Sequence, residues 1–248
     1  MQAVILAGGS VSGSLKEVFP ELTNKAHLKV NDKMLIEYVL AAVLECRFIE
    51  KVFIVGDKDF LLRHISNERV TILPDKGNVY DNFMQAADAG GAEKMLLLTG
   101  DIPLINVEAL TSFLVNCTSG REIYYAIVSK DSIMHYDPTG KRTYAKIGKR
   151  VFTGGNVFMV NVAAVRRIRP AVEQIFAKRK SIFALLNMVG IGFVLKYLVG
   201  MVELADIERC AARILESDVQ AVICEHASIG IDVDKVQDFE LVKRHLSQ

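Results

Sequence analysis

Apolar runs of strand length alternate with amphipathic runs along the first hundred residues. Buried strands are expected at residues 2–7, 51–56, 70–73 and 94–99. Between them, apolar positions recur at helical spacing, which predicts helices at residues 34–46, 61–65 and 79–89. Strands and helices that alternate in this way indicate an α/β protein with a mostly parallel, doubly wound sheet and helices on both faces.

The second half of the chain has a different rhythm. Residues 143–152 read as a hairpin around Gly148, and Thr153-Gly154-Gly155-Asn156 is expected to break the chain before a strand at residues 157–160. The remaining pattern predicts strands at residues 122–129 and 219–224 and helices at residues 107–116, 162–177, 182–199, 204–216 and 236–246. No linker-like change of composition divides the chain, so we expect a single domain over residues 1–248.

Composition narrows the function classes. Half of the 248 residues are hydrophobic (51%) and the net charge is +1, so the sequence predicts an ordered core and gives no reason to expect nucleic acid as a partner. The densest basic stretch, residues 142–150, is interrupted by glycine and tyrosine. The four cysteines form no CxxC pair and read as reduced thiols, and no secretion signal is recognised, so we expect a cytoplasmic protein.

One segment, residues 181–202, departs from this pattern because it is apolar and nearly free of charge. Lys196, Asn187 and three glycines argue against a helix that spans a membrane, which needs roughly 20 apolar residues. Two interpretations remain open. The segment forms a pair of buried helices, or it forms a hydrophobic lid that meets a lipid-like acceptor or a second subunit in a homodimer.

The first candidate for chemistry is the Gly8-Gly9 turn, which directly follows the strand at residues 2–7. A glycine-rich turn after a buried strand lets backbone N–H groups approach a phosphate, because no Cβ stands in the way. Neither the dinucleotide fingerprint nor the phosphate loop of NTPases is present. Lys16 and Lys25 are close enough in sequence to add positive charge to the same site.

Three aspartates are candidate metal ligands. Asp101 follows the strand at residues 94–99 and, like Gly8-Gly9, falls at the carboxyl end of a parallel strand, where ligands bind in such sheets. A carboxylate near phosphate suits Mg²⁺. Asp232 and Asp234 alternate and so share one face of an extended segment; they are either the cap of the last helix or the second half of a metal site. No histidine pair has zinc-ligand spacing, and no motif supplies a nucleophile for covalent catalysis.

Taken together, five short motifs resemble the MobA-like nucleotidyltransferase family, which has the nucleotide-diphospho-sugar transferase fold, a three-layer Rossmann-like sheet. The motifs are VILAGG at residues 4–9, NKAHL with NDKML at residues 24–35, LTGDIPL at residues 98–104, TGGN at residues 153–156 and DVDKVQDF at residues 232–239. They cover nearly the whole chain in the family's order. The resemblance implies transfer of a nucleoside monophosphate from an NTP to a phosphorylated or hydroxylated acceptor, such as a sugar phosphate, with release of pyrophosphate. A lipid-linked acceptor is a separate hypothesis, suggested by the apolar segment at residues 181–202.

The resemblance also implies roles for particular residues. It implies nucleotide contacts for Ala7, Gly8 and Gly9, and for Asn78 and Asn82 in the loop over the base (residues 74–82). It places Asn156 beside the acceptor. Lys25 would neutralise phosphate charge, and Asp101 and Asp234, with Asp232 nearby, would hold Mg²⁺. The loop backbone is expected to read the base, so the sequence identifies neither the base nor the acceptor.

One departure from the family pattern keeps other functions open. Family members read G-G-x-G-x-R after the first strand, whereas this chain has no arginine before Arg47. Lys16 is the candidate substitute, although lysine lacks the bidentate fork of arginine. The leading hypothesis is an Mg²⁺-dependent nucleotidyltransferase. The alternatives are a related transferase that uses a ready-made nucleotide-sugar and a non-catalytic module that binds a nucleotide or sugar phosphate.

Overall fold

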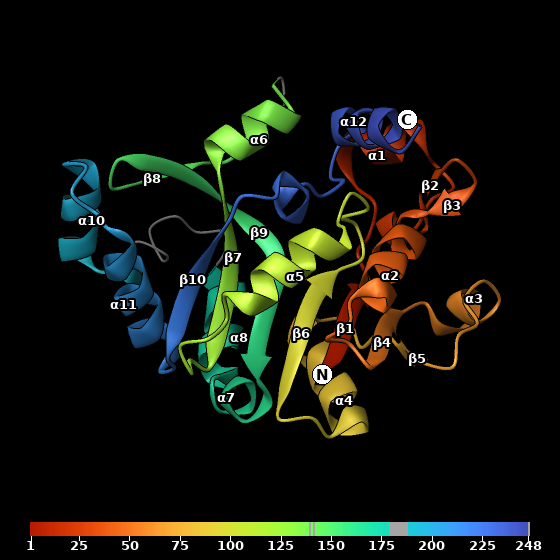
Figure 1. The fold of residues 1–248 in the computed structure, drawn as a ribbon, viewed down its shortest axis with the longest axis horizontal. Coiled ribbons are helices and arrows are strands. Elements are labelled where there is room, and N and C mark those ends of the chain that lie inside the picture. The colour runs from red at the N-terminus through yellow and green to blue at the C-terminus, as the bar shows by residue number, and fades with distance from the viewer. Residues whose placement is uncertain (139, 141, 179–187, 248) are drawn as a thin grey trace.

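One mixed sheet runs through the protein in the computed structural model, which describes residues 1–138, 140, 142–178 and 188–247 (Figure 1). Its strands are β1 (Gln2–Ala7), β4 (Lys51–Gly56), β5 (Val70–Pro74), β6 (Lys94–Thr99), β7 (Ile123–Ser129), β8 (Ala145–Ile147), β9 (Arg150–Asn161) and β10 (Val219–Cys224). They lie in the order β10-β7-β9-β6-β1-β4-β5, and β8 pairs with β9. Among these described strands, β9 runs antiparallel to its neighbours β6, β7 and β8, and all the other pairs are parallel. A separate hairpin joins β2 (Lys29–Val30) to β3 (Lys33–Met34).

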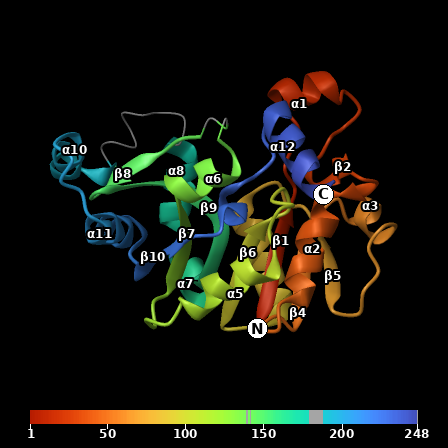
Figure 2. The same cartoon turned by 45° about the horizontal axis from the view of Figure 1, so that its top comes forward.

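Helices cover both faces of this sheet. They are α1 (Gly13–Val18), α2 (Leu35–Glu45), α3 (Lys58–Leu62), α4 (Val79–Gly90), α5 (Val107–Val115), α6 (Lys130–Tyr136), α7 (Val162–Arg167), α8 (Arg169–Lys178), α10 (Ile191–Leu198), α11 (Leu204–Leu215) and α12 (Val236–Leu246), with short 3₁₀ helices η1 (Lys25–His27) and η2 (Ala227–Gly230). In Figures 1 and 2, α2 and α5 lie in front of the sheet, and α4, α7 and α8 lie behind it. The predicted three-layer α/β architecture is therefore confirmed.

Alternation along each central strand explains why both faces are covered. Ala3, Ile5 and Ala7 of β1 belong to the core cluster that includes α2 and α5, whereas Val4 belongs to the cluster that includes α4. Successive side chains of a strand point to opposite faces, so a strand that is apolar at every position needs a helix on each side. This requirement makes the first half of the chain a doubly wound sheet.

The order of the strands places a ligand site. From β1 the chain winds outward through β4 and β5, and then returns to place β6 on the other side of β1. Beyond the carboxyl ends of β1 and β6, the connections therefore leave in opposite directions, and such a switch point forms a crevice. Gly8 follows β1 and Asp101 follows β6, so both border this crevice.

Two sequence predictions for residues 153–177 are wrong. Residues 153–156 do not break the chain but continue through β9. A Cβ at Gly154 would lie 1.9 Å from Tyr125 Oη, and one at Gly155 would lie 2.7 Å from Ile229 Cγ2. Glycine is therefore needed here because neighbouring side chains pack against the backbone of the strand, and not because the chain turns. The single helix expected at residues 162–177 is divided into α7 and α8, where Pro170 lacks the N–H that would continue the helix.

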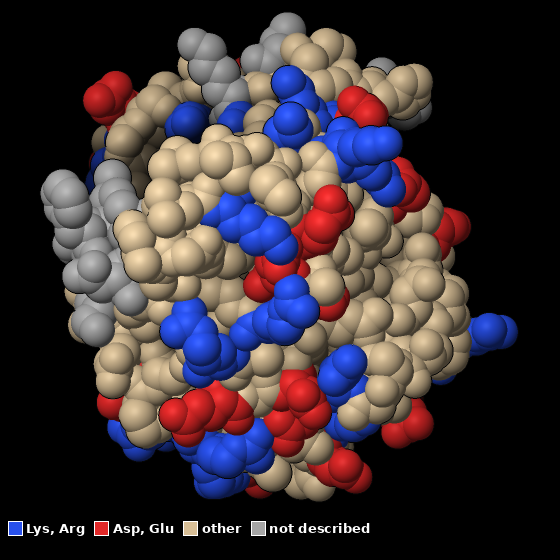
Figure 3. All heavy atoms as spheres, turned by 90° about the vertical axis from the view of Figure 1, so that its left-hand side faces the viewer, with Lys and Arg blue, Asp and Glu red and all other residues tan. Residues whose placement is uncertain are grey.

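The apolar segment is only partly described, because residues 179–187 lie outside the described residues. In α10 the interpretation as a buried helix is wrong: Ile191 is 74% exposed and Leu198 is 73% exposed. The lid and second-subunit interpretations stay predictions. Figure 3 views this side of the molecule and shows Lys and Arg intermixed with Asp and Glu. In the part of the chain that the structure describes, no helix is both long and apolar enough to cross a membrane.

Candidate active site

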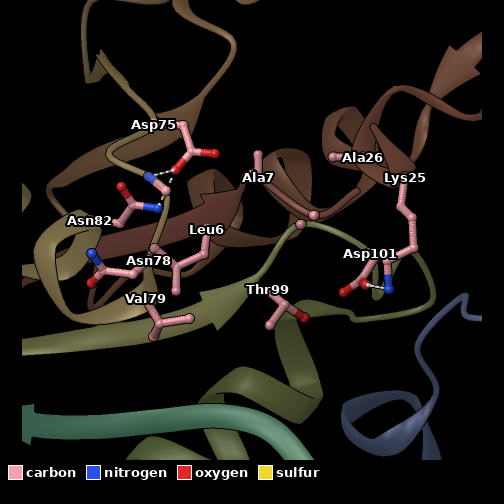
Figure 4. Close-up of a pocket in the computed structure, with 14 residues that line it drawn as sticks. Leu6, Ala7, Lys25, Ala26, Asp75, Asn78, Val79, Asn82, Thr99 and Asp101 are labelled. Atoms are coloured by element: carbon pink, nitrogen blue, oxygen red, sulfur yellow. Dashed lines mark hydrogen bonds and ion pairs between the residues drawn. The ribbon is translucent and has the colours of Figure 1, made fainter. Parts of the chain in front are cut away.

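The loop after β1 is fastened so that Lys25 faces the switch-point crevice. Asn24 Nδ2 donates to the carbonyl oxygen of Ala7 at 2.5 Å, and Asn24 Oδ1 accepts from the N–H of Ala26 at 2.9 Å, which caps η1. The N–H of Lys25 donates to Gly9 O at 2.9 Å. These bonds tie the short η1 helix to the end of β1, and Figure 4 shows the Lys25 side chain extending toward Asp101.

Lys25 joins aspartates from two distant parts of the chain. Its Nζ lies 2.7 Å from Asp101 Oδ2 and also pairs with Asp234 Oδ1. Asp232 completes the group, since one carboxylate oxygen from each of Asp101, Asp232 and Asp234 lies within 4.8 Å of the others. The N–H of Val233 donates to Asp101 O at 2.9 Å and holds the C-terminal segment beside the end of β6. The structure thus brings together four of the predicted site residues.

Burial and neighbouring charges set the protonation of this cluster. Burial alone would lower the pKa of Lys25, but Asp101 and Asp234 raise it above its ordinary value. Burial, with Asp234 and Asp101, raises the pKa of Asp232 against the opposing effect of Arg142. Burial would also raise the pKa of Asp234, yet its contact with Lys25 lowers it below the ordinary value. Lys25 is therefore held as an ammonium group.

Arg142 is a site residue that the sequence reasoning missed. Its Nη1 donates to Gly230 O at 2.6 Å and to Asp232 Oδ1 at 3.1 Å, and its Nη2 lies 4.0 Å from Asp238 Oδ1. The signal in the sequence was only the basic stretch of residues 142–150, because no motif connects Arg142 to residues about ninety positions later. Arg142 thus holds Asp232, the one aspartate of the cluster for which no ion pair with Lys25 is found among the described residues.

The three aspartates fit a divalent cation. Asp101 Oδ1 is buried and has no hydrogen-bond partner among the described residues, which leaves a strong acceptor without a donor. Lys25 pairs with Asp101 and Asp234, and Arg142 pairs with Asp232, so all three carboxylates are held toward one point by cationic neighbours. An all-oxygen donor set of this kind suits Mg²⁺, which takes one or two carboxylates and completes its shell with water and phosphate.

A cleft with loop glycines in its floor runs from this cluster along the ends of β1 and β5 (Figure 4). A Cβ at Gly8 would lie 2.5 Å from Asp75 Oδ2, and one at Gly9 would lie 3.3 Å from Lys25 Cε. Glycine therefore allows the walls of the cleft to approach each other. The residues that line it are Leu6, Ala7, Gly8, Gly9, Lys25, Ala26, Asp75, Gly77, Asn78, Val79, Asn82, Thr99, Gly100 and Asp101.

A second cleft lies on the other side of the carboxylates. Its lining includes Arg142, Thr153, Asn156, Asp232 and Asp234. Asn156 Nδ2 donates to Ile229 O at 3.4 Å. The aspartates Asp232 and Asp234 thus border this cleft while Asp101 and Lys25 border the first, so the carboxylate cluster stands between two binding spaces.

Lys16 is the predicted site residue that the structure does not bring to the cluster. Its exposed Nζ donates to Pro20 O at 2.5 Å and to Leu22 O at 3.1 Å, and it lines neither cleft. Asn78 and Asn82 do line the first cleft. Asn78 Oδ1 caps α4 by accepting from the N–H of Asp81 at 2.8 Å, and Asn82 Oδ1 accepts from the N–H of Lys76 at 2.7 Å.

Comparisons with known proteins agree with this geometry. The model of the MobA-like NTP transferase domain matches residues 3–189. A solved structure described as a hypothetical transferase from Thermus thermophilus is 31% identical, with a TM-score of 0.84, and the alignment covers 96% of this chain and 98% of that one. None of the curated proteins matches the sequence.

Two more distant structures share the fold. CMP:2-keto-3-deoxy-manno-octonic acid synthetase, solved in complex with CTP, is 13% identical with a TM-score of 0.64, and the match covers 100% of this chain and 98% of that one. A 2-C-methyl-D-erythritol 4-phosphate cytidylyltransferase from Francisella tularensis is 10% identical with a TM-score of 0.59, and the match covers 98% of both chains.

Proposed function

The chain belongs to the MobA-like NTP transferase family, and from this we propose that it transfers a nucleoside monophosphate from an NTP to a phosphorylated acceptor, with release of pyrophosphate. The observation that carries the proposal is the cluster of Lys25, Asp101, Asp232 and Asp234 between two clefts. The acceptor class, a sugar or a lipid-linked phosphate, is part of the proposal, as is a cytoplasmic location.

The two clefts divide the substrates between them. The NTP lies in the first cleft, where the N–H groups of the Gly8-Gly9 loop and the ammonium of Lys25 donate to its phosphate oxygens. The acceptor lies in the second cleft, beside Asn156 and Arg142. An oxygen of the acceptor attacks the α-phosphorus, a new P–O bond forms, and the bond to the bridging oxygen of the β-phosphate breaks. Positioning and charge stabilisation are sufficient for this reaction, which needs no protein nucleophile.

Mg²⁺ is the proposed cofactor, held by Asp101 and Asp234 with Asp232 nearby. When bound, it would neutralise part of the charge on the phosphates. The buried Asp101 Oδ1 without a hydrogen-bond partner among the described residues supports this assignment. Lys25 contributes the second positive charge on the same side of the cleft.

A second candidate function has one observation in its favour. Lys16, the only substitute for the missing arginine in the first loop, uses its ammonium to bind two carbonyl oxygens of its own loop. A site without that charge would bind a nucleotide or sugar phosphate without turning it over.

Pyrophosphate release distinguishes the two functions. The full chain is assayed with each of the four NTPs, Mg²⁺ and a panel of sugar phosphates and alcohol phosphates. Two structural neighbours are described as a cytidylyltransferase and a CTP complex, so CTP is the first nucleotide to test. We expect release with one base, reduced by about 10²-fold or more in Asp101→Asn, and unchanged in Asp88→Asn, whose exposed side chain pairs with Arg166 on the surface.

Each negative result has its own meaning. No release, with NTP binding still measurable by calorimetry, favours the binding module. Release of pyrophosphate from an NTP excludes the alternative that uses a ready-made nucleotide-sugar. The absence of both release and NTP binding contradicts the proposal.

A further inference from the structure

Lys25 bridges the two carboxylates that are proposed to hold the divalent cation. Its Nζ lies 2.7 Å from Asp101 Oδ2 and also pairs with Asp234 Oδ1, so one ammonium group joins the end of β6 to the C-terminal segment. The side chain of Lys25 is only 16% exposed. Carboxylates that are partly withdrawn from water need a positive charge beside them, because an unpaired charge is costly to bury. Lys25 meets this need from within the chain.

The two contacts of Lys25 differ in how firmly the carboxylate is held. The Asp101 side chain is 15% exposed, and the carbonyl oxygen of Asp101 accepts from the N–H of Val233 at 2.9 Å. The Asp234 side chain is 57% exposed, and its ammonium contact spans the gap between two separate segments of the chain. Asp101 also keeps a second oxygen, Oδ1, which has no hydrogen-bond partner among the described residues. Asp234 is therefore the partner that Lys25 gives up more easily.

The first cleft places a second demand on the same ammonium group. Among the described residues that line this cleft, Lys25 is the one with a cationic side chain, so phosphates in the cleft depend on it. The end of its stem runs along the glycine loop, since a Cβ at Gly9 would lie 3.3 Å from Cε. Figure 4 shows the side chain turned toward Asp101. A lysine stem is flexible, so rotation near Nζ can turn the ammonium group from the carboxylates toward the loop.

We propose that Lys25 is an internal counter-ion that changes partners when a divalent cation binds: its ammonium group leaves Asp234 and donates to the phosphates of the NTP. An ion held by Asp101 and Asp234 would lie next to Nζ, and the two positive charges would repel each other strongly where little water screens them. Asp234 therefore exchanges the ammonium group for the ion. The inference rests on the proposed function, which places the ion at these carboxylates and the NTP in the first cleft.

Ion binding without nucleotide tests this exchange. The full chain is titrated with Mn²⁺, which prefers oxygen ligands as Mg²⁺ does, and the electron paramagnetic resonance signal of the free ion gives the bound fraction. Lys25→Met keeps an unbranched stem but removes the ammonium group. We expect this variant to bind Mn²⁺ about tenfold or more tightly than the unmutated protein, because the ion no longer displaces a hydrogen bond between charged groups.

Lys16→Met is the matched control. It removes the same charge from the segment between β1 and η1, but Lys16 Nζ donates to Pro20 O and Leu22 O and does not contact the aspartates. We expect its affinity for Mn²⁺ to equal that of the unmutated protein. Equal tightening in Lys16→Met and Lys25→Met would show a general effect of net charge and would overturn the inference.

The ammonium group can also be followed in the unmutated protein. Lysine labelled with ¹⁵N gives an NMR signal from Nζ when ion pairs protect its hydrogens from exchange with water. We expect the Lys25 signal to be lost as Mg²⁺ saturates the protein without nucleotide, because exchange quickens when the pair with Asp234 opens. Its absence in Lys25→Arg assigns the signal, and this variant keeps the positive charge, so the measurement does not depend on the folding of Lys25→Met.

The outcomes separate this inference from the proposed function. Mn²⁺ binding that is unchanged or weaker in Lys25→Met overturns the inference, and so does a Lys25 signal that keeps its exchange rate in saturating Mg²⁺. Tighter Mn²⁺ binding in Lys25→Met, without pyrophosphate release by the unmutated protein, supports the counter-ion and contradicts the proposed function. The absence of Mn²⁺ binding in both proteins contradicts the proposed cofactor and the inference together.

Discussion

His27 connects the site loop to the core of the protein through its ring. It lies two residues after Lys25 in η1, and its ring stacks on Phe60 at a centroid distance of 4.1 Å. Its Nε2 is buried and has no hydrogen-bond partner among the described residues. A protonated imidazole would place a charge where the described surroundings offer no acceptor, so the native loop needs a neutral His27.

Stability should therefore fall at mildly acidic pH. Burial lowers the pKa of His27 below its ordinary value of 6.5, with Asp57 opposing and His64 adding to the effect. The unfolded chain binds this proton more readily than the folded chain, so the free energy of unfolding decreases as the pH falls below about 6.5. Urea unfolding at pH 7.5 and 5.5 measures the change. His27→Phe, which keeps an aromatic ring on Phe60, should lose less stability over this interval than the unmutated protein, and an equal loss would contradict the assignment.

At the scale of the element, β9 depends on the absence of side chains at its centre. Gly154 pairs with Ile127 of β7, but the hydroxyl of Tyr125 reaches its backbone, and the Tyr125 ring is stacked on Phe158 at 4.6 Å and so cannot swing away freely. Gly154→Ala would place a Cβ 1.9 Å from Tyr125 Oη. We expect it to destabilise the protein by about 1–3 kcal/mol through overpacking.

A double mutant identifies the cause. Tyr125→Phe removes the hydroxyl that the new Cβ would meet, so Gly154→Ala should cost less in that background, and the difference measures the clash. Gly192→Ala in α10 is the control, since a Cβ there meets nothing within 4 Å. If Gly154→Ala is equally costly with and without the tyrosine hydroxyl, backbone strain rather than the clash is responsible.

Elements whose sequence pattern reflects burial were predictable, and elements shaped by a distant neighbour were not. The apolar runs of β1, β4 and β6 identified buried strands, and the residues after β1 and β6 pointed to the candidate site, because strand ends meet at one edge of a parallel sheet. The glycines of β9 read as a break because Tyr125 and Ile229, which require them, are far away in sequence. The apolar face of α10 read as buried because periodicity does not reveal whether a partner covers it.

At the scale of the whole molecule, the two ends of the chain meet at the site. The Lys25 pair with Asp234 is one link between them. Phe19 packs edge-on against Phe239 of α12 at 5.2 Å, and the N–H of Val236 donates to Ser14 Oγ at 3.4 Å. In Figures 1 and 2, α12 lies beside α1. The loop that carries Lys25 is thus covered by the last helix of the chain.

Loss of this packing should weaken the site from outside it. Phe239→Ala removes a buried aromatic ring, and we expect a loss of about 3–5 kcal/mol in unfolding free energy. Hydrogen exchange should quicken at the N–H groups of Lys25 and Val233, which bond Gly9 O and Asp101 O, although Phe239 lines neither cleft. Leu198→Ala, on the exposed face of α10, should change stability by about 0.5 kcal/mol or less. If exchange at Lys25 is unchanged in Phe239→Ala while stability falls, α12 supports the fold but does not hold the site, and the two ends of the chain contribute to it independently.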